Sequence, residues 1–415
     1  MKPRPSPLLS REMSTKVERE VAHWLATALK SQNLSNFSVK LVGNSGKGDG
    51  FVGDVLFVHL STPHQRHNLV LKCSKRSEAL KKFPSIERIF INETFLYETL
   101  LPTFIDFQKE KNLAEIFDSV PKFHGSYKSE SVHVIVLEDL KKLGFELWPV
   151  TKPLNRDHIE FVICEYGKFH ATSVALKTLQ PENFHQLVDT IRENIDAVVH
   201  TSLKNLMTRI VHNSAELLQG ELDQNLIQRF ADLAEKTDQI LRDLESEQRL
   251  RVVCHGDCWS NNFMYKYYGE RRNVPAKVAL IDWQIANYAT PVSDLSYFLF
   301  SCLSEEDFEH LDDILSVYRL AFSNHLRDFG LDSEKLYPCE QFTDDWRTCS
   351  GFGLIMATMV TKASYIEKDE IVGIDEVAEQ GKTLADSFLS EIRDKEGYRK
   401  RIGYLVKNAA KYGLI

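Results

Sequence analysis

Two polar stretches in the second half of the chain each follow a short apolar run. The first is Cys254–Asn262, which contains Asp257 and ends in Asn262. The second begins at Asp282, directly after the apolar run Val278–Ile281. A buried strand that ends at a functional loop has this pattern, because the apolar residues anchor a polar turn. The sequence therefore predicts two carboxylates and an amide on two loops that could face each other.

These three side chains suit phosphoryl transfer. One carboxylate can orient an acceptor hydroxyl and accept its proton, while an amide oxygen and a second carboxylate hold Mg²⁺ against nucleotide phosphates. We expect Asp257 to act on the hydroxyl, and Asn262 and Asp282 to be the metal ligands.

The same segment has two other interpretations. Cys254, His255, Asp257 and Cys258 are all of zinc-ligand type, and a zinc-dependent hydrolase is one hypothesis. However, Cys-x₃-Cys is not the spacing of a zinc finger or ribbon, and no second ligand pair follows. A solvated turn between two strands would explain the glycine and asparagines but not the strand that ends in an acid.

The order of these residues resembles a known family. His255-Gly256-Asp257, with Asn262 five positions after the Asp, and then Ile281-Asp282 are similar to the catalytic and metal loops of the aminoglycoside/choline kinase group. The fuller pattern, His-Gly-Asp-x-Trp-x-Asn-Asn and later Ile-Asp-Trp-Gln, resembles the ecdysteroid kinase-like branch of that group. The resemblance covers about Gly43 to Ser301.

This resemblance implies an α+β, two-lobed protein-kinase-like fold. The smaller lobe would hold an antiparallel sheet with one main helix, and the larger lobe would be mostly helical. ATP and Mg²⁺ would be the cofactors, and the γ-phosphoryl group would pass to an alcohol of a small molecule, by analogy an ecdysteroid or a hydroxylated xenobiotic. A catalytically silent nucleotide- or ligand-binding pseudokinase is the alternative. The presence of Lys72, Asp257, Asn262 and Asp282 argues against that alternative.

Changes in periodicity predict three regions. Residues 1–36 form an N-terminal extension with a helix that begins at Ser14 or Thr15 and runs to Lys30. Residues 37–139 show short strand patterns and form the nucleotide-binding lobe. Residues 140–415 are mostly helical in pattern and form the catalytic and substrate-binding lobe.

A glycine-rich segment separates two strand patterns, Phe37–Val42 and Phe51–Leu60. We expect Gly46, Gly48 and Gly50 to bring backbone N–H groups close to nucleotide phosphates, because glycine permits such an approach. An ordinary hairpin tip is nearly as good an explanation. The related family has Lys-Gly-Asp-Asn-Tyr here, and this chain departs from that pattern with Lys-Gly-Asp-Gly-Phe.

A lysine and a glutamate downstream form a second predicted pair. Lys72 ends the apolar strand pattern that begins at Leu69, and Glu93 lies on the apolar stripe of a helix that starts after Pro84. A carboxylate facing a core costs several kcal/mol unless it is paired, so roughly this amount favours a Lys72–Glu93 ion pair. Such a pair positions the α- and β-phosphates in kinases. A glutamate at the rim of the stripe is the alternative, and the family pattern suggests that Leu101-Pro102 ends this helix.

Several further site residues follow from the resemblance alone. Glu138 and Leu140 would contact the adenine through the segment that connects the lobes. His255, Asp294 and His170 would support the catalytic loop, although His170 could instead be catalytic. Capping alone could explain Asp294, with Ser293 as the N-cap of a helix over Leu295–Leu303.

An apolar acceptor would need an apolar wall. We expect Trp259 and Trp346 to supply it, although an aromatic and methionine-rich segment such as Phe342–Met359 is more often core.

Composition excludes several classes. The 415 residues carry 51 basic and 59 acidic side chains, and duplex nucleic-acid binders normally show a basic excess. Neither a secretory signal nor an apolar run long enough for a membrane span is present. Seven scattered cysteines favour a reducing compartment. We expect a cytoplasmic protein whose partner is a small-molecule alcohol, without nucleic acid or an obligate protein partner.

Overall fold

Strand segments with alternating apolar residues build one five-stranded antiparallel sheet near the N-terminus. The computed structural model describes residues 11–30, 36–44, 53–76, 84–150, 152–195, 197–269, 272–366, 379–380 and 392–415. The strand order is β1-β2-β3-β5-β4. The strands are β1 (Ser38–Asn44), β2 (Gly53–Ser61), β3 (Arg66–Ser74), β4 (Phe123–Lys128) and β5 (His133–Glu138).

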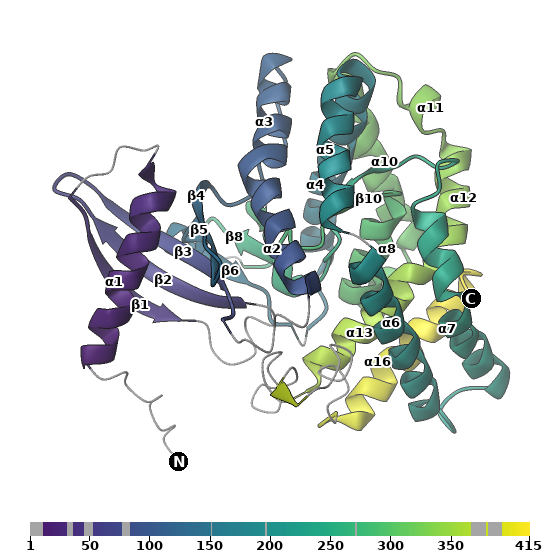
Figure 1. Ribbon diagram of the computed structural model, residues 1–415. Coiled ribbons are helices and arrows are strands. Elements are labelled where there is room, and N and C mark those ends of the chain that lie inside the picture. Colours follow the sequence, from purple (N-terminus) through teal and green to yellow (C-terminus); the bar gives the residue numbers. More distant parts are fainter. Residues whose placement is uncertain are drawn as a thin grey trace.

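One face of this sheet is covered by helix α1 (Arg11–Ala28) (Figure 1). Val21, Trp24 and Leu25 of the helix share a buried cluster with alternate sheet residues, among them Val58 and Leu71. Successive strand residues point to opposite faces of a sheet. The residues that alternate with those of this cluster therefore lie on the face away from α1. The N-terminal helix predicted from the sequence is confirmed, and it begins at Arg11 rather than at Ser14 or Thr15.

The opposite face carries Lys72. In the β2–β3 pairing, Val55 lies opposite Lys72 and Phe57 lies opposite Val70, so these four residues share one face. Helix α2 (Pro84–Phe95) supplies Glu93 to Lys72 on this side.

The helix that begins with α2 does not end at Leu101-Pro102, so that expectation was wrong. It continues through a π-helical segment, Leu96–Leu100, into α3 (Leu101–Glu110). The Leu101 N–H bonds the Leu96 carbonyl, five residues back. A proline has no N–H and its ring clashes with the carbonyl four residues earlier, and a wider turn relieves both problems.

The rest of the chain is mostly helical and forms the other end of the molecule (Figure 1). Asn155 accepts a hydrogen bond from the His158 N–H and caps α4. Ser293 is not an N-cap, because α8 already begins at Val292 after Pro291. The helices are α4 (Arg156–Leu179), α5 (Pro181–Asn194), α6 (Ala197–Leu217), α7 (Gln224–Leu244), α8 (Val292–Cys302), α9 (Glu305–Phe308), α10 (Leu311–Asp328), α11 (Ser333–Leu336), α12 (Cys339–Cys349), α13 (Gly351–Ser364) and α16 (Lys395–Lys411).

Two small sheets lie among these helices and hold the polar stretches. One has the order β6-β8-β9, and the other pairs β7 with β10. Their strands are β6 (Phe145–Leu147), β7 (Val252–Cys254), β8 (Phe263–Lys266), β9 (Lys277–Leu280) and β10 (Asn287–Ala289). An antiparallel sheet followed by a mostly helical lobe confirms the predicted α+β class, with a small sheet-containing part and a larger helical part.

The helices in the described part of the chain were compared with the length and apolar character of a membrane span. None of its helices has both the length and the apolar character needed to cross a bilayer.

The contact between α1 and the sheet is testable. Trp24 is 3% exposed and lies in the cluster that joins the helix to the sheet. We expect Trp24→Ala to lower the free energy of unfolding by about 3–5 kcal/mol, because it leaves a large cavity. Urea denaturation followed by far-UV circular dichroism measures this loss. Leu320→Ala, at a side chain that is 63% exposed, is the control, with an expected change within about 0.5 kcal/mol. Equal effects of the two variants would contradict the packing role of α1.

Candidate active site

The two polar stretches lie side by side because their flanking strands are paired. Phe263 of β8 lies opposite Leu280 of β9, and the Ile281 N–H donates to the Asn262 carbonyl at 3.0 Å. Asn262 and Asp282 therefore stand at the ends of neighbouring strands. β10 pairs with β7, which leads directly into His255.

Asp257 is held by hydrogen bonds to both of its carboxylate oxygens. Tyr297 Oη donates to Oδ1 at 3.0 Å, and Asn262 Nδ2 donates to Oδ2 at 2.8 Å. Burial and then the negative charge of Asp282 raise the pKa of Asp257 to about 7, against the lowering effect of these two hydrogen bonds. Asn262 also links Asp257 to the segment before Asp282, since its backbone carbonyl accepts from the Ile281 N–H.

Lys72 contacts two carboxylates at once. Its Nζ lies 2.6 Å from Glu93 Oε2 and 2.6 Å from Asp282 Oδ1. Burial alone would lower the pKa of Lys72, but the charges of Asp282 and Glu93 raise it above its usual range. Burial raises the pKa of Glu93 to about 7, with Lys72 acting in the other direction. The Lys72–Glu93 pair predicted from the sequence is present, and Asp282 joins it across the two lobes.

The backbone of Asp282 is in the left-handed region. Its φ is +66°, which is uncommon for residues other than glycine and most accessible to Asn and Asp. Asn92 of α2 fixes the segment that follows, since its Nδ2 donates to the carbonyls of Gln284 at 3.2 Å and Ala286 at 2.9 Å. A helix of the first lobe therefore binds the loop of the second.

Asp294 fixes the backbone that leads to Asp257. Its carboxylate accepts from the His255 N–H at 2.7 Å and from the Gly256 N–H at 2.9 Å. His170 Nε2 lies 3.2 Å from the same carboxylate, while His170 Nδ1 lies 3.0 Å from Tyr318 Oη. Burial opposes ionisation, yet the hydrogen bonds from His170 and Gly256 hold the pKa of Asp294 below its usual value. The support role of Asp294 and His170 stays a prediction, and this geometry suits it.

Glycine is required at position 256. Its φ is +85°, and a Cβ there would lie 2.3 Å from the Ile285 carbonyl oxygen.

The His255 ring lies between the two stretches, with Nε2 3.0 Å from the Ile281 carbonyl and Nδ1 accepting from the Asp257 N–H at 3.2 Å.

The four zinc-ligand candidates do not share a site. The Cys258 thiol donates to Asp294 at 3.1 Å, whereas the Cys254 thiol lies 3.6 Å from the Ala289 carbonyl. Within the described residues, the ligand-type side chains that gather within 4.8 Å are instead His170, Cys254 and Asp294. All three are buried, and His170 and Asp294 already hydrogen bond each other. The zinc hydrolase hypothesis is therefore not favoured.

The donor set at the centre of the site suits Mg²⁺. Carboxylate and amide oxygens are its preferred protein ligands. The Nδ2 of Asn262 is bonded to Asp257, which leaves the amide oxygen for other contacts, and the Asp282 side chain is 30% exposed. Lys72 supplies one positive charge against three carboxylates, Glu93, Asp257 and Asp282, so the ionised site carries an excess of negative charge. A divalent cation would offset this excess.

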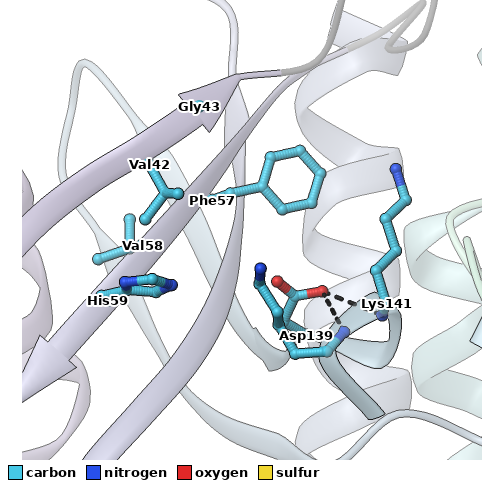
Figure 2. A pocket seen from close by; sticks show the side chains of 8 residues that line it. Val42, Gly43, Phe57, Val58, His59, Asp139 and Lys141 are labelled. Carbon is cyan, nitrogen blue, oxygen red and sulfur yellow. Dashed lines mark hydrogen bonds between the residues drawn. The ribbon is translucent and has the colours of Figure 1, made fainter. Parts of the chain in front are cut away.

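A cavity of about 240 Å³ lies between the first two strands and the segment after β5. Figure 2 shows the Phe57 ring and Lys141 on its two sides, with Asp139 accepting from the backbone N–H groups that follow it. Lys141 Nζ lies 5.1 Å from the centre of the Phe57 ring. The lining residues are Val42, Gly43, Phe57, Val58, His59, Asp139, Lys141 and Lys142.

The predicted adenine-contacting residues lie next to this cavity. The Glu138 side chain accepts from the Lys122 N–H at 2.7 Å, so it is turned toward β4. Leu140 is buried with Met264 and Ala279 in a small apolar cluster. Any contact of Glu138 with a base would therefore use its backbone, and the assignment of both residues stays a prediction.

The rings of the two remaining tryptophan candidates are not joined to the site by any described contact, although the backbone N–H of Trp259 donates to the Asp257 carbonyl at 3.2 Å. Trp346 is 7% exposed in α12 and belongs to the main core, and Trp259 is partly buried against that core. Their role as acceptor walls stays a prediction. Gly46, Gly48 and Gly50 lie outside the described residues.

Two residues that contact the site were not predicted. Tyr297 lies one helical turn after Asp294, and this spacing places both on one side of α8. Asn92 directly precedes Glu93. The spacing could have identified Tyr297, but nothing in the sequence indicates that Asn92 binds a loop almost two hundred residues away.

The support by Asp294 can be tested through stability. Asp294→Asn presents one oxygen instead of two to the N–H groups of His255 and Gly256, so a buried donor loses its acceptor. We expect a loss of about 2–4 kcal/mol in the free energy of unfolding. Asp106→Asn is the control, because Asp106 is 68% exposed and should change stability by less than about 0.5 kcal/mol. An Asp294→Asn variant as stable as this control would contradict the role.

Comparison with known proteins identifies the family. The chain resembles the GDP complex of an aminoglycoside 2'-phosphotransferase mutant (13% identity, 95% of this chain and 98% of that chain, TM-score 0.44). It also resembles a Plasmodium vivax ethanolamine kinase (11% identity, 100% and 98%, TM-score 0.44). These similarities transfer no residue or ligand to this chain, and no curated protein matches it. The model of the ecdysteroid kinase-like family matches residues 47–331, more than half of the sequence, and the chain therefore belongs to the ecdysteroid kinase-like family.

Proposed function

We propose that this protein is an ATP-dependent small-molecule kinase that transfers the γ-phosphoryl group to an alcohol hydroxyl. The observation that carries the proposal is the convergence of Lys72, Asp257, Asn262 and Asp282, which come from two lobes and three separate stretches of the chain.

Each of these residues has a role that its contacts support. Asp257 would accept the proton of the acceptor hydroxyl, because its carboxylate is fixed by two donors and its raised pKa suits a base near neutral pH. Lys72, oriented by Glu93, would hold the phosphates. Asn262 and Asp282 would hold Mg²⁺, which when bound neutralises charge on the transferred phosphoryl group.

The cavity beside Phe57 and Lys141 is the proposed entrance for the nucleotide base. Phe57 and Val70 lie on the Lys72 face of the sheet, and the Leu140–Met264 cluster lies between the lobes. A flat aromatic base between these apolar groups would direct its phosphates toward Lys72, two residues after Val70 on the same strand face.

The acceptor class rests on family membership. Members of an ecdysteroid kinase-like family would be expected to act on ecdysteroids or other hydroxylated apolar compounds, and we propose this class for the present chain. A cytoplasmic location is likewise proposed, with support from seven cysteines that are all free thiols. The pseudokinase alternative is disfavoured by the complete set of acidic, amide and lysine side chains.

The experiment uses purified protein with labelled ATP, Mg²⁺ and an extract of small hydroxylated metabolites. We expect mass spectrometry to find an acceptor that has gained one phosphoryl group. Asp257→Asn should reduce kcat by at least about 100-fold, since general base catalysis contributes about 10²–10⁴-fold. ATP binding, measured by calorimetry, should persist in this variant.

Asp106→Asn is the matched control for the assay, because it makes the same substitution at a side chain that is 68% exposed and outside the proposed site, and it should keep the wild-type activity. Joint loss of ATP binding and folding in Asp257→Asn would instead indicate a structural aspartate. ATP binding by the wild type without transfer to any acceptor or water would favour the pseudokinase.

A further inference from the structure

The phenol of Tyr297 is fully buried, yet it lies at the centre of the proposed site. Its Oη donates to Asp257 Oδ1 at 3.0 Å from the first turns of α8, and the side chain is 0% exposed. Asn262 donates to the other oxygen of the same carboxylate at 2.8 Å. Two donors from different elements therefore hold the two oxygens of Asp257.

This arrangement restricts rotation of the carboxylate. A carboxylate held at one oxygen can still turn about its Cβ–Cγ bond, because that torsion is broad and nearly two-fold. A second donor at the other oxygen selects one orientation. The lone pairs of Asp257 that the two donors leave free then face a fixed direction, which matters when an acceptor hydroxyl must approach within hydrogen-bond distance.

The position of Tyr297 depends on a close contact between α8 and α13. At Gly353 a Cβ would lie 2.2 Å from the Ser296 carbonyl carbon, so only glycine lets the two helices approach this closely. Phe352, the residue before this glycine, meets the Tyr297 ring edge-on with the ring centres 6.4 Å apart. The start of α13 thus positions α8 in two ways. Gly353 permits the close approach of the two helices, and Phe352 packs against the Tyr297 ring.

We infer that Tyr297 is a positioning residue for phosphoryl transfer, which orients Asp257 toward the acceptor hydroxyl. This inference rests on the proposed function. The Tyr297 hydroxyl donates to Asp257, and no described hydrogen bond joins it to Asp282, so it acts through Asp257.

The test is Tyr297→Phe, which removes only the hydroxyl. The reaction measured is Mg²⁺-dependent phosphate release from ATP with water as the acceptor, in the full-length protein. We expect kcat to fall about 10- to 100-fold, the effect of losing one hydrogen bond to a charged group. The KM for ATP should stay within about twofold of the wild-type value, because the lost hydroxyl does not contribute to ATP binding in the ground state.

Tyr398→Phe is the matched control. Tyr398 is 1% exposed and its Oη lies 2.7 Å from Ser214 Oγ, so this variant also removes one buried tyrosine hydroxyl, remote from Asp257. It should lower the thermal midpoint to a similar extent as Tyr297→Phe while kcat stays at the wild-type value.

The outcomes separate the two proposals. Wild-type kcat in Tyr297→Phe, or an equal loss of kcat in Tyr398→Phe, overturns the positioning role and leaves the proposed function intact. Unchanged turnover in Asp257→Asn would instead overturn the proposed function, and with it this inference. A lower kcat confined to Tyr297→Phe supports the inference.

Discussion

The contact of one ammonium group with two carboxylates determines how the lobes of this protein fit together. Lys72 lies on the sheet, Glu93 on the following helix, and Asp282 on a loop of the helical lobe, each carboxylate 2.6 Å from the lysine Nζ. A buried charge without a partner costs several kcal/mol or more, so roughly this penalty opposes any movement that separates the three groups. Asn92 adds two hydrogen bonds from the same helix to the backbone after Asp282.

A second set of buried polar contacts fixes the backbone of the loop that carries Asp257. Asp294 accepts two backbone N–H groups, one cysteine thiol and a histidine, and all of its bonds lie inside the helical core. Buried polar networks are stable only when each member is satisfied, which links these side chains into one unit. The loop then presents Asp257 outward with its own carboxylate held by Tyr297 and Asn262. The Asp294 contacts keep this loop rigid, and the carboxylates of Asp257 and Asp282 supply excess negative charge. A preorganised site that binds a metal–nucleotide complex needs both.

The parts of the site that could be predicted from the sequence have a strong local signal. Glu93 interrupts an apolar helical stripe, and an acid inside such a stripe requires a cation, which made Lys72 a natural partner. The acid-ended strand before Asp282 and the spacing within Cys254–Asn262 also depend on near neighbours in the chain. The division into a strand-rich and a mostly helical region follows from the change in periodicity, whereas the predicted fold class came from the family resemblance.

Other features depend on tertiary contacts that no local pattern contains. A proline inside a helix normally ends it. At Pro102 the helix continues because the preceding segment, Leu96–Leu100, forms a wider π-helical turn. The bond from Tyr297 to Asp257 joins α8 to a loop forty residues earlier in the chain. Ser293 has a typical capping side chain, but the chain already turns into the helix at Val292. In each case the geometry of the folded chain departs from, or adds to, what the local sequence indicates.

We propose that Asn262 and Asp282 hold one divalent cation beside Lys72 and Asp257. The most direct measurement is a crystal structure of the protein with a non-hydrolysable ATP analogue and Mn²⁺, collected at a wavelength where manganese scatters anomalously. We expect an anomalous peak about 2.0–2.3 Å from the Asn262 amide oxygen and an Asp282 carboxylate oxygen, in contact with the nucleotide phosphates. A peak at His170, Cys254 and Asp294, or a nucleotide whose phosphates lie away from Lys72, would contradict it.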